Sequence, residues 1–252
     1  MNIKPHKVKS WTFHKEMTEE EKKQFTHSSQ KICTLYKQSA SLYKKGVRIL
    51  SVDEKTGIQA LEIKTREDIK PGHAALRDSE YIRHGTKCLT GGFDIVSGKL
   101  VYHKIEDTRK EEDFVAFITG MIIDPNMKYI IINDQLNTHK SAKLVEFAAS
   151  YCGIKKDLGK KGKKGILKNM DSRQKFLEDE SHKLRFVFTP KHSSWLNQIE
   201  IWFGILTRRL LKRLTVSSLD ELVKRLNDFI TFFNKALAHP FKWNYTGKIL
   251  HK

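Results

Sequence analysis

The segment KYIIIND, residues 128–134, restricts the fold of this chain more than any other. It is a short, uninterrupted run of apolar residues between polar ones, which is typical of a β-strand buried on both faces. A strand buried in this way needs a layer of helices on each side of its sheet. The rest of the sequence must therefore supply further strands and amphipathic helices, and the predicted fold is of the α/β class.

Further strands are predicted before and after this segment. Residues 46–64 contain two β-rich runs around the turn-like sequence EKTG, which predicts a hairpin. Residues 87–105 contain another pair of β-rich runs around Ser97 and Gly98, and residues 184–189 form one more run. Meandering strands followed by alternating helices and strands predict a mixed sheet covered by helices.

Apolar residues at helical spacing predict helices in the remaining segments. The first helix ends at Gly46, and the helix after residue 107 opens with Thr108 and Glu111 at capping-box spacing. Ser218 and Glu221 have the same spacing before the last helix. The predicted buried faces are Phe25, Ile32, Leu35 and Tyr36 in the first helix, Phe114, Phe117, Ile118 and Met121 in the second, and Leu222, Leu226, Phe229, Ile230 and Phe233 in the last.

The composition favours a nucleic-acid partner. Lys and Arg number 47 against 29 Asp and Glu, so the formal net charge is +18. This excess suggests a polyanion, nucleic acid or an anionic membrane, although a merely basic soluble protein also fits. The N-terminal residues lack an apolar signal region, no apolar run approaches the ~20 residues that span a bilayer, and three widely spaced cysteines indicate reduced thiols. We therefore expect a cytoplasmic protein that binds nucleic acid and no membrane.

A carboxylate, Glu200, lies on or beside the apolar face of the helix predicted after residue 195. A buried carboxylate without a partner costs several kcal/mol or takes up a proton. It is either a helix-edge residue paired with Lys or Arg, or a metal ligand with partners elsewhere in the chain. The apolar face consists of Leu196, Ile199, Trp202, Phe203 and Leu206, and we expect Trp195, Trp202 and Phe203 to lie in the core rather than to stack on bases.

Two aspartates at predicted strand ends are the natural partners of Glu200. Asp53 lies near the end of the first core strand and Asp134 at the end of the central one, and ligands gather where the strands of such sheets end. Either aspartate alone also fits a turn residue that hydrogen-bonds its own loop. Glu54 competes with Asp53, because neighbouring strand residues face opposite sides and both faces are apolar here. Two Asp and one Glu suit two Mg²⁺ ions, which promote in-line displacement at phosphorus.

Several motifs, in order along nearly the whole chain, resemble one known family. They are VDEKTGIQALE, YIRHGT, NDQLNTHKS, TPKHSSWLNQIEIWF and HPFKWNYTGK. The chain resembles the catalytic part of bacterial insertion-sequence transposases of the mariner-like group, within the DDE transposase and integrase superfamily. The resemblance implies an RNase H-like fold, with a mixed five-stranded sheet and helices on both faces. It also implies Mg²⁺ or Mn²⁺ as cofactor, double-stranded DNA as substrate, and DNA cleavage and strand transfer as activity.

The resemblance also assigns site residues and domains. It implies that Asp53, Asp134 and Glu200 are catalytic and hold two metal ions, and it chooses Asp53 over Glu54. The separation of Asp134 and Glu200, 200 − 134 = 66 positions, exceeds that in many relatives, and the Lys- and Gly-rich residues 157–183 account for the excess as an insertion.

The domain organisation is expected to follow the same family. Residues 1–46 resemble the helical linker of the family, and residues 47–252 resemble its catalytic domain. Full-length relatives begin with helix-turn-helix DNA-binding modules, so we expect an upstream helix-turn-helix segment or chain as partner. We also expect a homodimer in the active state, acting on nucleoid DNA in the bacterial cytoplasm.

Other residues are candidates for contacts around the site. His139 and Lys140 can touch the scissile phosphate, or can be a helix-start His and a solvated Lys. Asn197 lies one turn before Glu200 and can orient it, and we expect Asn197 and His139 to support the metal ligands. The densest basic cluster is expected to contact DNA, although a solvated flexible loop has the same composition. It consists of Lys160, Lys161, Lys163 and Lys164.

Three functions fit these observations. The first is a metal-dependent DDE transposase catalytic domain that cuts DNA at element ends and joins the released 3′-hydroxyl to target DNA. The second is an RNase H-like nuclease that acts on other nucleic acids, and strand-transfer assays would separate the two. The third is an inactive DNA-binding fragment that inhibits intact transposase, and the complete set of three acids argues against it.

Overall fold

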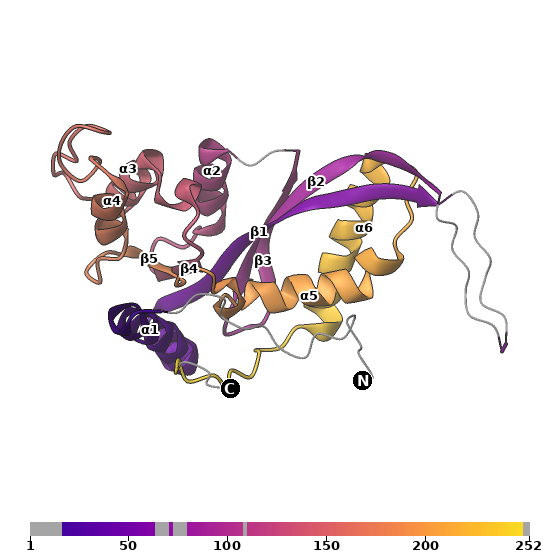
Figure 1. The fold of residues 1–252 in the computed structure, drawn as a ribbon, viewed down its shortest axis with the longest axis horizontal. Coiled ribbons are helices and arrows are strands. Elements are labelled where there is room, and N and C mark those ends of the chain that lie inside the picture. The colour runs from indigo at the N-terminus through magenta and orange to yellow at the C-terminus, as the bar shows by residue number, and fades with distance from the viewer. Residues whose placement is uncertain (1–16, 64–70, 73–79, 108–109, 249–252) are drawn as a thin grey trace.

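A mixed five-stranded sheet forms the centre of the structure, a computed structural model that describes residues 17–63, 71–72, 80–107 and 110–248 (Figure 1). The spatial order of the strands is β3-β2-β1-β4-β5. β1, β2 and β3 pair antiparallel, whereas β4 pairs parallel with both β1 and β5. The predicted mixed sheet is confirmed. The strands are β1 (Val47–Ile63), β2 (Tyr81–Asp94), β3 (Leu100–Glu106), β4 (Lys128–Asn133) and β5 (Leu184–Phe188).

Helices cover both faces of the sheet, as predicted. One face packs against α1 (Glu19–Lys44), α5 (Ile199–Arg209) and α6 (Leu219–Phe232), and the other against α2 (Glu111–Met121), α3 (Ala142–Tyr151) and α4 (Met170–Leu177). The apolar residues of β4 pack against both helical layers, because Ile130 and Ile132 belong to one core cluster and Ile131 to the other. Shorter elements are the 3₁₀ helices η1 (Asn137–Lys140), η2 (Ser194–Leu196) and η3 (Leu211–Arg213) and the π-helical η4 (Phe233–Leu237).

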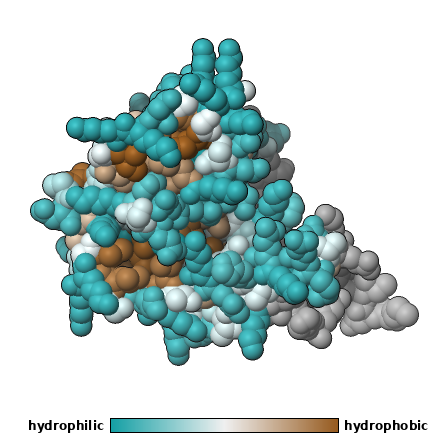
Figure 2. Space-filling model, turned by 90° about the vertical axis from the view of Figure 1, so that its left-hand side faces the viewer, coloured by the Kyte–Doolittle hydropathy of each residue, from teal (hydrophilic) through white to brown (hydrophobic). Residues whose placement is uncertain are grey.

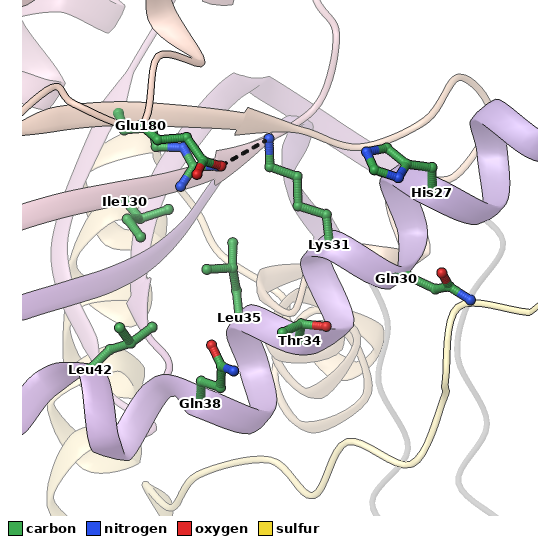
Figure 3. Close-up of a pocket in the computed structure, with 10 residues that line it drawn as sticks. His27, Gln30, Lys31, Thr34, Leu35, Gln38, Leu42, Ile130 and Glu180 are labelled. Atoms are coloured by element: carbon green, nitrogen blue, oxygen red, sulfur yellow. Dashed lines mark hydrogen bonds and ion pairs between the residues drawn. The ribbon is translucent and has the colours of Figure 1, made fainter.

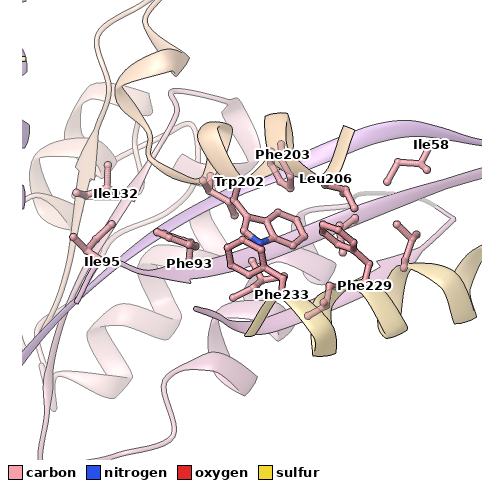
Figure 4. Close-up of a cluster of buried hydrophobic side chains, with 14 of the residues drawn as sticks. Ile58, Phe93, Ile95, Ile132, Trp202, Phe203, Leu206, Phe229 and Phe233 are labelled. Atoms are coloured by element: carbon pink, nitrogen blue, oxygen red, sulfur yellow. The ribbon is translucent and has the colours of Figure 1, made fainter. Parts of the chain in front are cut away.

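Trp202 anchors α5 to the sheet and to α6 (Figure 4). Its side chain is fully buried, and its ring meets Phe229 and Phe233 edge-on at centroid distances of 6.3 and 5.9 Å. Large aromatic side chains contribute much of the stabilisation of a core. The helix that carries Glu200 is therefore held in one position, and the predicted burial of Trp202 and Phe203 is confirmed.

β1 differs from the predicted hairpin. Residues 47–63 form one long strand, and the sequence EKTG produces a shift in its pairing with β2 between Lys55 and Ile58. Gly57 has a φ of 67°, which glycine adopts without steric cost and which both bulges and tight turns use. The prediction of a turn at EKTG was wrong, because a glycine in this backbone conformation is typical of both a tight turn and a β-bulge. β1 and β2 extend together past α2 and α3 and lie beside α5 and α6 (Figure 1).

The predicted helix boundaries are mostly confirmed. Every residue predicted for the buried faces of the three helices is buried, and the Ser218 hydroxyl caps α6 by accepting the Glu221 N–H at 3.1 Å. The start of α2 was misplaced. Glu111 is its first residue, and the Lys110 N–H donates to Asp113 at 2.7 Å, while Thr108 lies outside the described residues.

The Lys- and Gly-rich segment of residues 157–183 is built into the domain. It contains α4, and Leu167 and Leu177 are buried in the core cluster beneath α2 and α3. That the segment is an insertion stays a prediction. Within the described part of the chain, no helix combines the length and apolar character required to cross a membrane.

Candidate active site

Asp134 directly follows β4, whereas Asp53 lies within the long strand β1 and not near its end, where the sequence had placed it; both lie just beyond the last residues that pair β1 with β4. Parallel pairing sets Ser51 of β1 opposite Ile132 of β4, so each aspartate follows its paired residue by two positions. Asp53 is only 7% exposed and Asp134 is half-buried. Burial, and then the negative charge of Asp134, raises the pKa of Asp53 to about 7. The structure therefore brings the two aspartates together, and their catalytic role stays a prediction.

Glu200 lies in the first turn of α5 and is half-buried. Burial raises the pKa of its carboxyl, the charge of Lys55 opposes that shift, and the charge of Asp134 adds to it. Glu200 forms no salt bridge within the part of the chain that the structure describes. Of the two explanations for this carboxylate, a helix-edge ion pair is thus not the one observed.

The carboxylates are chemically suited to a divalent cation. Burial and the negative charge of Asp134 both disfavour the ionised forms of Asp53 and Glu200. A bound cation would stabilise those ionised forms. Carboxylate oxygens are the donors that Mg²⁺ and Mn²⁺ prefer. Among the described residues, however, no group of three or more His, Cys, Asp and Glu side chains is arranged to hold a metal ion. The donor set fits the ion, and the metal site stays a prediction.

Asn197 is fully buried beside Asp53. Its side-chain amide donates to the Val52 carbonyl at 2.8 Å and to Asp53 Oδ2 at 3.4 Å, and its Oδ1 accepts from the Ser51 hydroxyl. Only its backbone carbonyl contacts Glu200, whose N–H donates to it at 3.0 Å. The side chain thus orients Asp53, whereas we expected it to orient Glu200. The difference arises because Asn197 precedes α5, so helical spacing does not apply to it.

His139 lies between two carboxylates, those of Asp134 and Glu54. Its Nδ1 lies 2.7 Å from Asp134 Oδ1 and its Nε2 lies 3.1 Å from Glu54 Oε1. Burial lowers the pKa of the imidazole, but the hydrogen bonds to both carboxylates outweigh it and raise the pKa to about 9. His139 therefore contacts a candidate metal ligand, as expected of a supporting residue. Its second partner, Glu54, was considered only as an alternative to Asp53.

Lys140 is buried, contrary to the solvated alternative. Its Nζ donates to Gln174 Oε1 at 3.3 Å and lies 5.6 Å from the centroid of the Phe188 ring. Burial lowers the pKa of its ammonium group. In this structure Lys140 contacts α4 and the end of β5, and its role in binding DNA stays a prediction.

The lysine cluster forms an ordered turn. The Lys160 N–H donates to the Lys164 carbonyl at 2.9 Å, and the two residues form an isolated antiparallel bridge. At Gly159 a Cβ atom would lie 2.1 Å from that carbonyl, so the turn requires glycine there. Hydrophilic side chains cover most of the end of the molecule that carries α3 and α4 (Figure 2). Lys160, Lys161, Lys163 and Lys164 are all exposed, and DNA contact stays a prediction.

Trp195 is not a core residue. Its side chain is 39% exposed and meets Tyr245 edge-on at 5.0 Å, so the expectation that it is buried was wrong. The loop that carries Trp195 is bonded to α1, because the Tyr36 hydroxyl donates to the Leu196 carbonyl at 2.7 Å.

A groove of about 570 Å³ beside α1 does not belong to this site (Figure 3). Its walls come from α1, β4, β5 and the segment before β5, and Lys31 lies 3.8 Å from Glu180 across it. None of the three candidate acids lines it. The chemistry suggested by Asp53, Asp134 and Glu200 therefore belongs to a different place, where β4 ends beside β1.

The sequence model of one protein family, described as DDE superfamily endonuclease, matches residues 48–223. This range is more than half of the chain and contains all three acids. The chain belongs to the DDE superfamily endonucleases. The predicted membership in the DDE superfamily is thereby confirmed. A comparison with curated proteins finds no match.

Solved structures similar to this DDE endonuclease are those of the Mos1 mariner transposase. Its paired-end complex with Mn has a TM-score of 0.57 at 14% identity, over 89% of this chain and 59% of that one. Its strand transfer complex has a TM-score of 0.54 at 12% identity, over 89% and 58%. Its isolated catalytic domain has a TM-score of 0.53 at 12% identity, over 88% and 85%. The predicted RNase H-like fold is confirmed, and the chain spans about three fifths of the protein in the paired-end complex.

Proposed function

We propose that this chain is the catalytic part of a mariner-like DDE transposase. It cuts DNA phosphodiester bonds at the ends of its element and joins the released 3′-hydroxyl to target DNA. The observation that carries the proposal is the parallel register that sets Asp53 beside Asp134, within a range that matches a DDE endonuclease family. Glu200 completes the set, because Asn197 and Ser51 bond the start of its helix to β1.

Asp53, Asp134 and Glu200 would hold two divalent ions, Mg²⁺ or Mn²⁺. When bound, such ions stabilise the attacking and leaving oxygens of an in-line displacement at phosphorus. The protein keeps the three carboxylates partly desolvated, orients Asp53 through Asn197, and orients Asp134 through His139. Two observations support this assignment: the donor set consists of hard oxygen atoms, and a Mos1 complex of similar fold was solved with Mn.

Double-stranded DNA is the proposed substrate. The net charge of +18 favours a polyanion, and the solved Mos1 structures include paired-end and strand transfer complexes. The exposed lysine turn and Lys140 are the proposed phosphate contacts. We further propose that a helix-turn-helix segment or chain supplies sequence recognition, that the active form is a homodimer, and that it acts on nucleoid DNA in the bacterial cytoplasm.

The direct test is a cleavage and joining assay. The purified chain, mixed or fused with the upstream helix-turn-helix segment, is incubated with labelled element-end duplex, target plasmid and Mn²⁺. We expect nicked ends and joined products, neither of which forms with Asp134→Asn. Cleavage without joining would instead indicate a nuclease, and DNA binding without cleavage would indicate an inactive inhibitor.

The proposed partners are tested by the affinity of the chain for DNA duplexes and by the mass of its complex with DNA. Without the helix-turn-helix segment, we expect the chain to bind element-end and scrambled duplexes within about tenfold of each other, well below the ~10³ ratio of specific binders. Light scattering of the complex with element-end DNA should give two protein chains. A strong preference of the isolated chain for the element end would show that it carries its own recognition.

A further inference from the structure

We propose that Glu54 is a positioning residue, which holds Asp134 in place through His139. The inference rests on the proposed function, since Asp134 is a metal ligand only there. It gives the adjacent acids of β1 different roles. Asp53 would bind metal, and Glu54 would hold the support for the other aspartate.

The contacts of the two acids place them on opposite faces of the sheet. Asp53 is bonded to Asn197, which precedes α5 on one face. Glu54 is bonded to His139, whose ring packs 4.2 Å from that of Phe114 in α2 on the other face. Glu54 is therefore buried with a partner of its own, and its side chain is only 5% exposed.

The His139 ring has one orientation that satisfies both of its nitrogens. It is fully buried, and each nitrogen faces a carboxylate oxygen, Asp134 Oδ1 on one side and Glu54 Oε1 on the other. Each ring nitrogen thus has a different carboxylate as its hydrogen-bond partner. Turning the ring would break both bonds inside the protein, where unpaired polar groups are costly.

Asp134 receives its orientation from this ring and from its own loop. Its Oδ1 accepts from His139 Nδ1 and also from the Leu136 N–H, at 2.9 Å. Since η1, which contains His139, follows Asp134 in the loop after β4, the contact with Glu54 is what ties this arrangement to β1, 85 positions away in sequence. Removing Glu54 would take away the partner of Nε2 and so weaken the support that the ring gives to Asp134 Oδ1. Supporting groups of this kind change metal affinity by roughly 10- to 100-fold.

Two measurements test the inference on the full chain. The first is hydrogen exchange of the Leu136 N–H by NMR, without metal, which reports on the position of Asp134. The second is Mn²⁺ affinity by calorimetry, without DNA. The variants are Glu54→Ala, Glu54→Gln, His139→Ala and the double variant Glu54→Ala/His139→Ala. Glu62→Ala is the matched control, because Glu62 is also on β1 and lies 2.7 Å from a histidine, His84.

We expect Glu54→Ala to accelerate exchange at Leu136 and to weaken Mn²⁺ binding about tenfold, at the low end of the range for supporting groups. Glu54→Gln should recover most of the exchange protection at Leu136 and most of the Mn²⁺ affinity, because its side-chain amide can still form a hydrogen bond with Nε2. Glu54→Ala should add nothing in the His139→Ala background, since coupled residues are not additive. Glu62→Ala should change neither.

Two results would overturn the inference. One is that Glu54→Ala leaves the exchange rate of the Leu136 N–H unchanged. The other is that the double variant binds Mn²⁺ about tenfold more weakly than His139→Ala alone, which would make Glu54 a metal ligand itself. If Asp134→Asn leaves Mn²⁺ affinity unchanged, the proposed metal centre fails. The exchange of the Leu136 N–H still decides the positioning role in that case.

Discussion

The hydroxyl of Ser51 on β1 accepts a hydrogen bond from the backbone N–H of Ile199, the first residue of α5, at 2.9 Å. The same hydroxyl donates to Asn197, whose amide donates to the Val52 carbonyl. The helix that carries Glu200 is thus bonded to the strand that carries Asp53. The geometry between these two acids is therefore determined by buried core contacts.

Asn197→Ala should reduce both stability and cleavage. It removes the hydrogen bond that the Val52 carbonyl accepts and the one that the Ser51 hydroxyl donates, although that hydroxyl still accepts from Ile199, and an unpaired buried group costs about 1–3 kcal/mol. It also removes the hydrogen bond that Asp53 Oδ2 accepts from Asn197. We expect a lower urea midpoint, and a fall in Mn²⁺-dependent cleavage that remains after correction for the folded fraction.

A second asparagine provides the control for this prediction. Asn234 bonds both the N–H and the carbonyl of Leu100, at 2.9 and 2.8 Å, rather than one of the acids. Asn234→Ala should lower the urea midpoint similarly and keep cleavage per folded molecule. Equal cleavage by the two variants would contradict a positioning role for Asn197.

The sequence predicted most of the sheet, because strands and helix faces are local patterns, but it placed Asp53 near the end of a strand that continues to Ile63. Asp53 and Asp134 follow apolar runs, and parallel pairing then aligns them. The contact between Glu54 and His139 could not be predicted, because it joins residues 85 positions apart and depends on which face each residue takes. The role of Gly57 was also missed, since a bulge and a turn need the same backbone conformation.

Asp53 should make the metal-free protein less stable as pH rises. Its folded pKa, about 7, is above the ordinary 3.8, so between these values the folded state binds a proton that the unfolded state does not. The stabilisation is full below about pH 4 and is lost as pH rises through about 7. At about 1.4 kcal/mol per pKa unit, the loss is on the order of 4 kcal/mol at most.

Thermal melting of Asp53→Asn against the unsubstituted chain checks this. We expect similar melting temperatures near pH 4 and a higher one for Asp53→Asn at pH 8, without metal. His139 adds its own loss as pH rises through about 9, and it does so in both proteins, so the difference between them isolates Asp53. Saturating Mn²⁺ should reduce the difference, because only the unsubstituted site keeps its full affinity. A constant difference between pH 4 and 8 would show that Asp53 is already ionised at pH 4.

Glu200→Gln should abolish cleavage without unfolding the protein. The change keeps the shape of a half-buried side chain that has no salt bridge among the described residues, and it removes a charge whose ionisation is costly there. We expect unchanged circular dichroism, an equal or higher melting temperature without metal, and weaker Mn²⁺ binding. Asp228→Asn is the control, since Asp228 pairs with Lys224 on the surface of α6. Cleavage by Glu200→Gln at the normal rate would remove Glu200 from the site.

Replacing the lysine turn should weaken DNA binding and its dependence on salt. Each lysine that neutralises a phosphate contributes about 0.9 to the slope of log affinity against log salt, so four contribute up to ~3.6. We therefore expect Lys160→Ala, Lys161→Ala, Lys163→Ala and Lys164→Ala together to reduce that slope by about 2 to 3.6. The loss of affinity should be similar for all duplex sequences, because phosphate contacts carry no base identity. The glycines keep the turn closed in this variant.

The control for the lysine turn removes the same charge from another surface. Lys23, Lys37, Lys44 and Lys45 are exposed on or just after α1, and replacing all four with Ala lowers the net charge equally. If binding depends only on net charge, the two quadruple variants will lose the same affinity at every salt concentration. If the turn contacts the phosphates, its variant alone will show the reduced slope, in fluorescence-anisotropy titrations of one duplex from low to moderate salt. Equal slopes in the two variants would assign the affinity to the overall charge of the domain and remove the turn from the DNA interface.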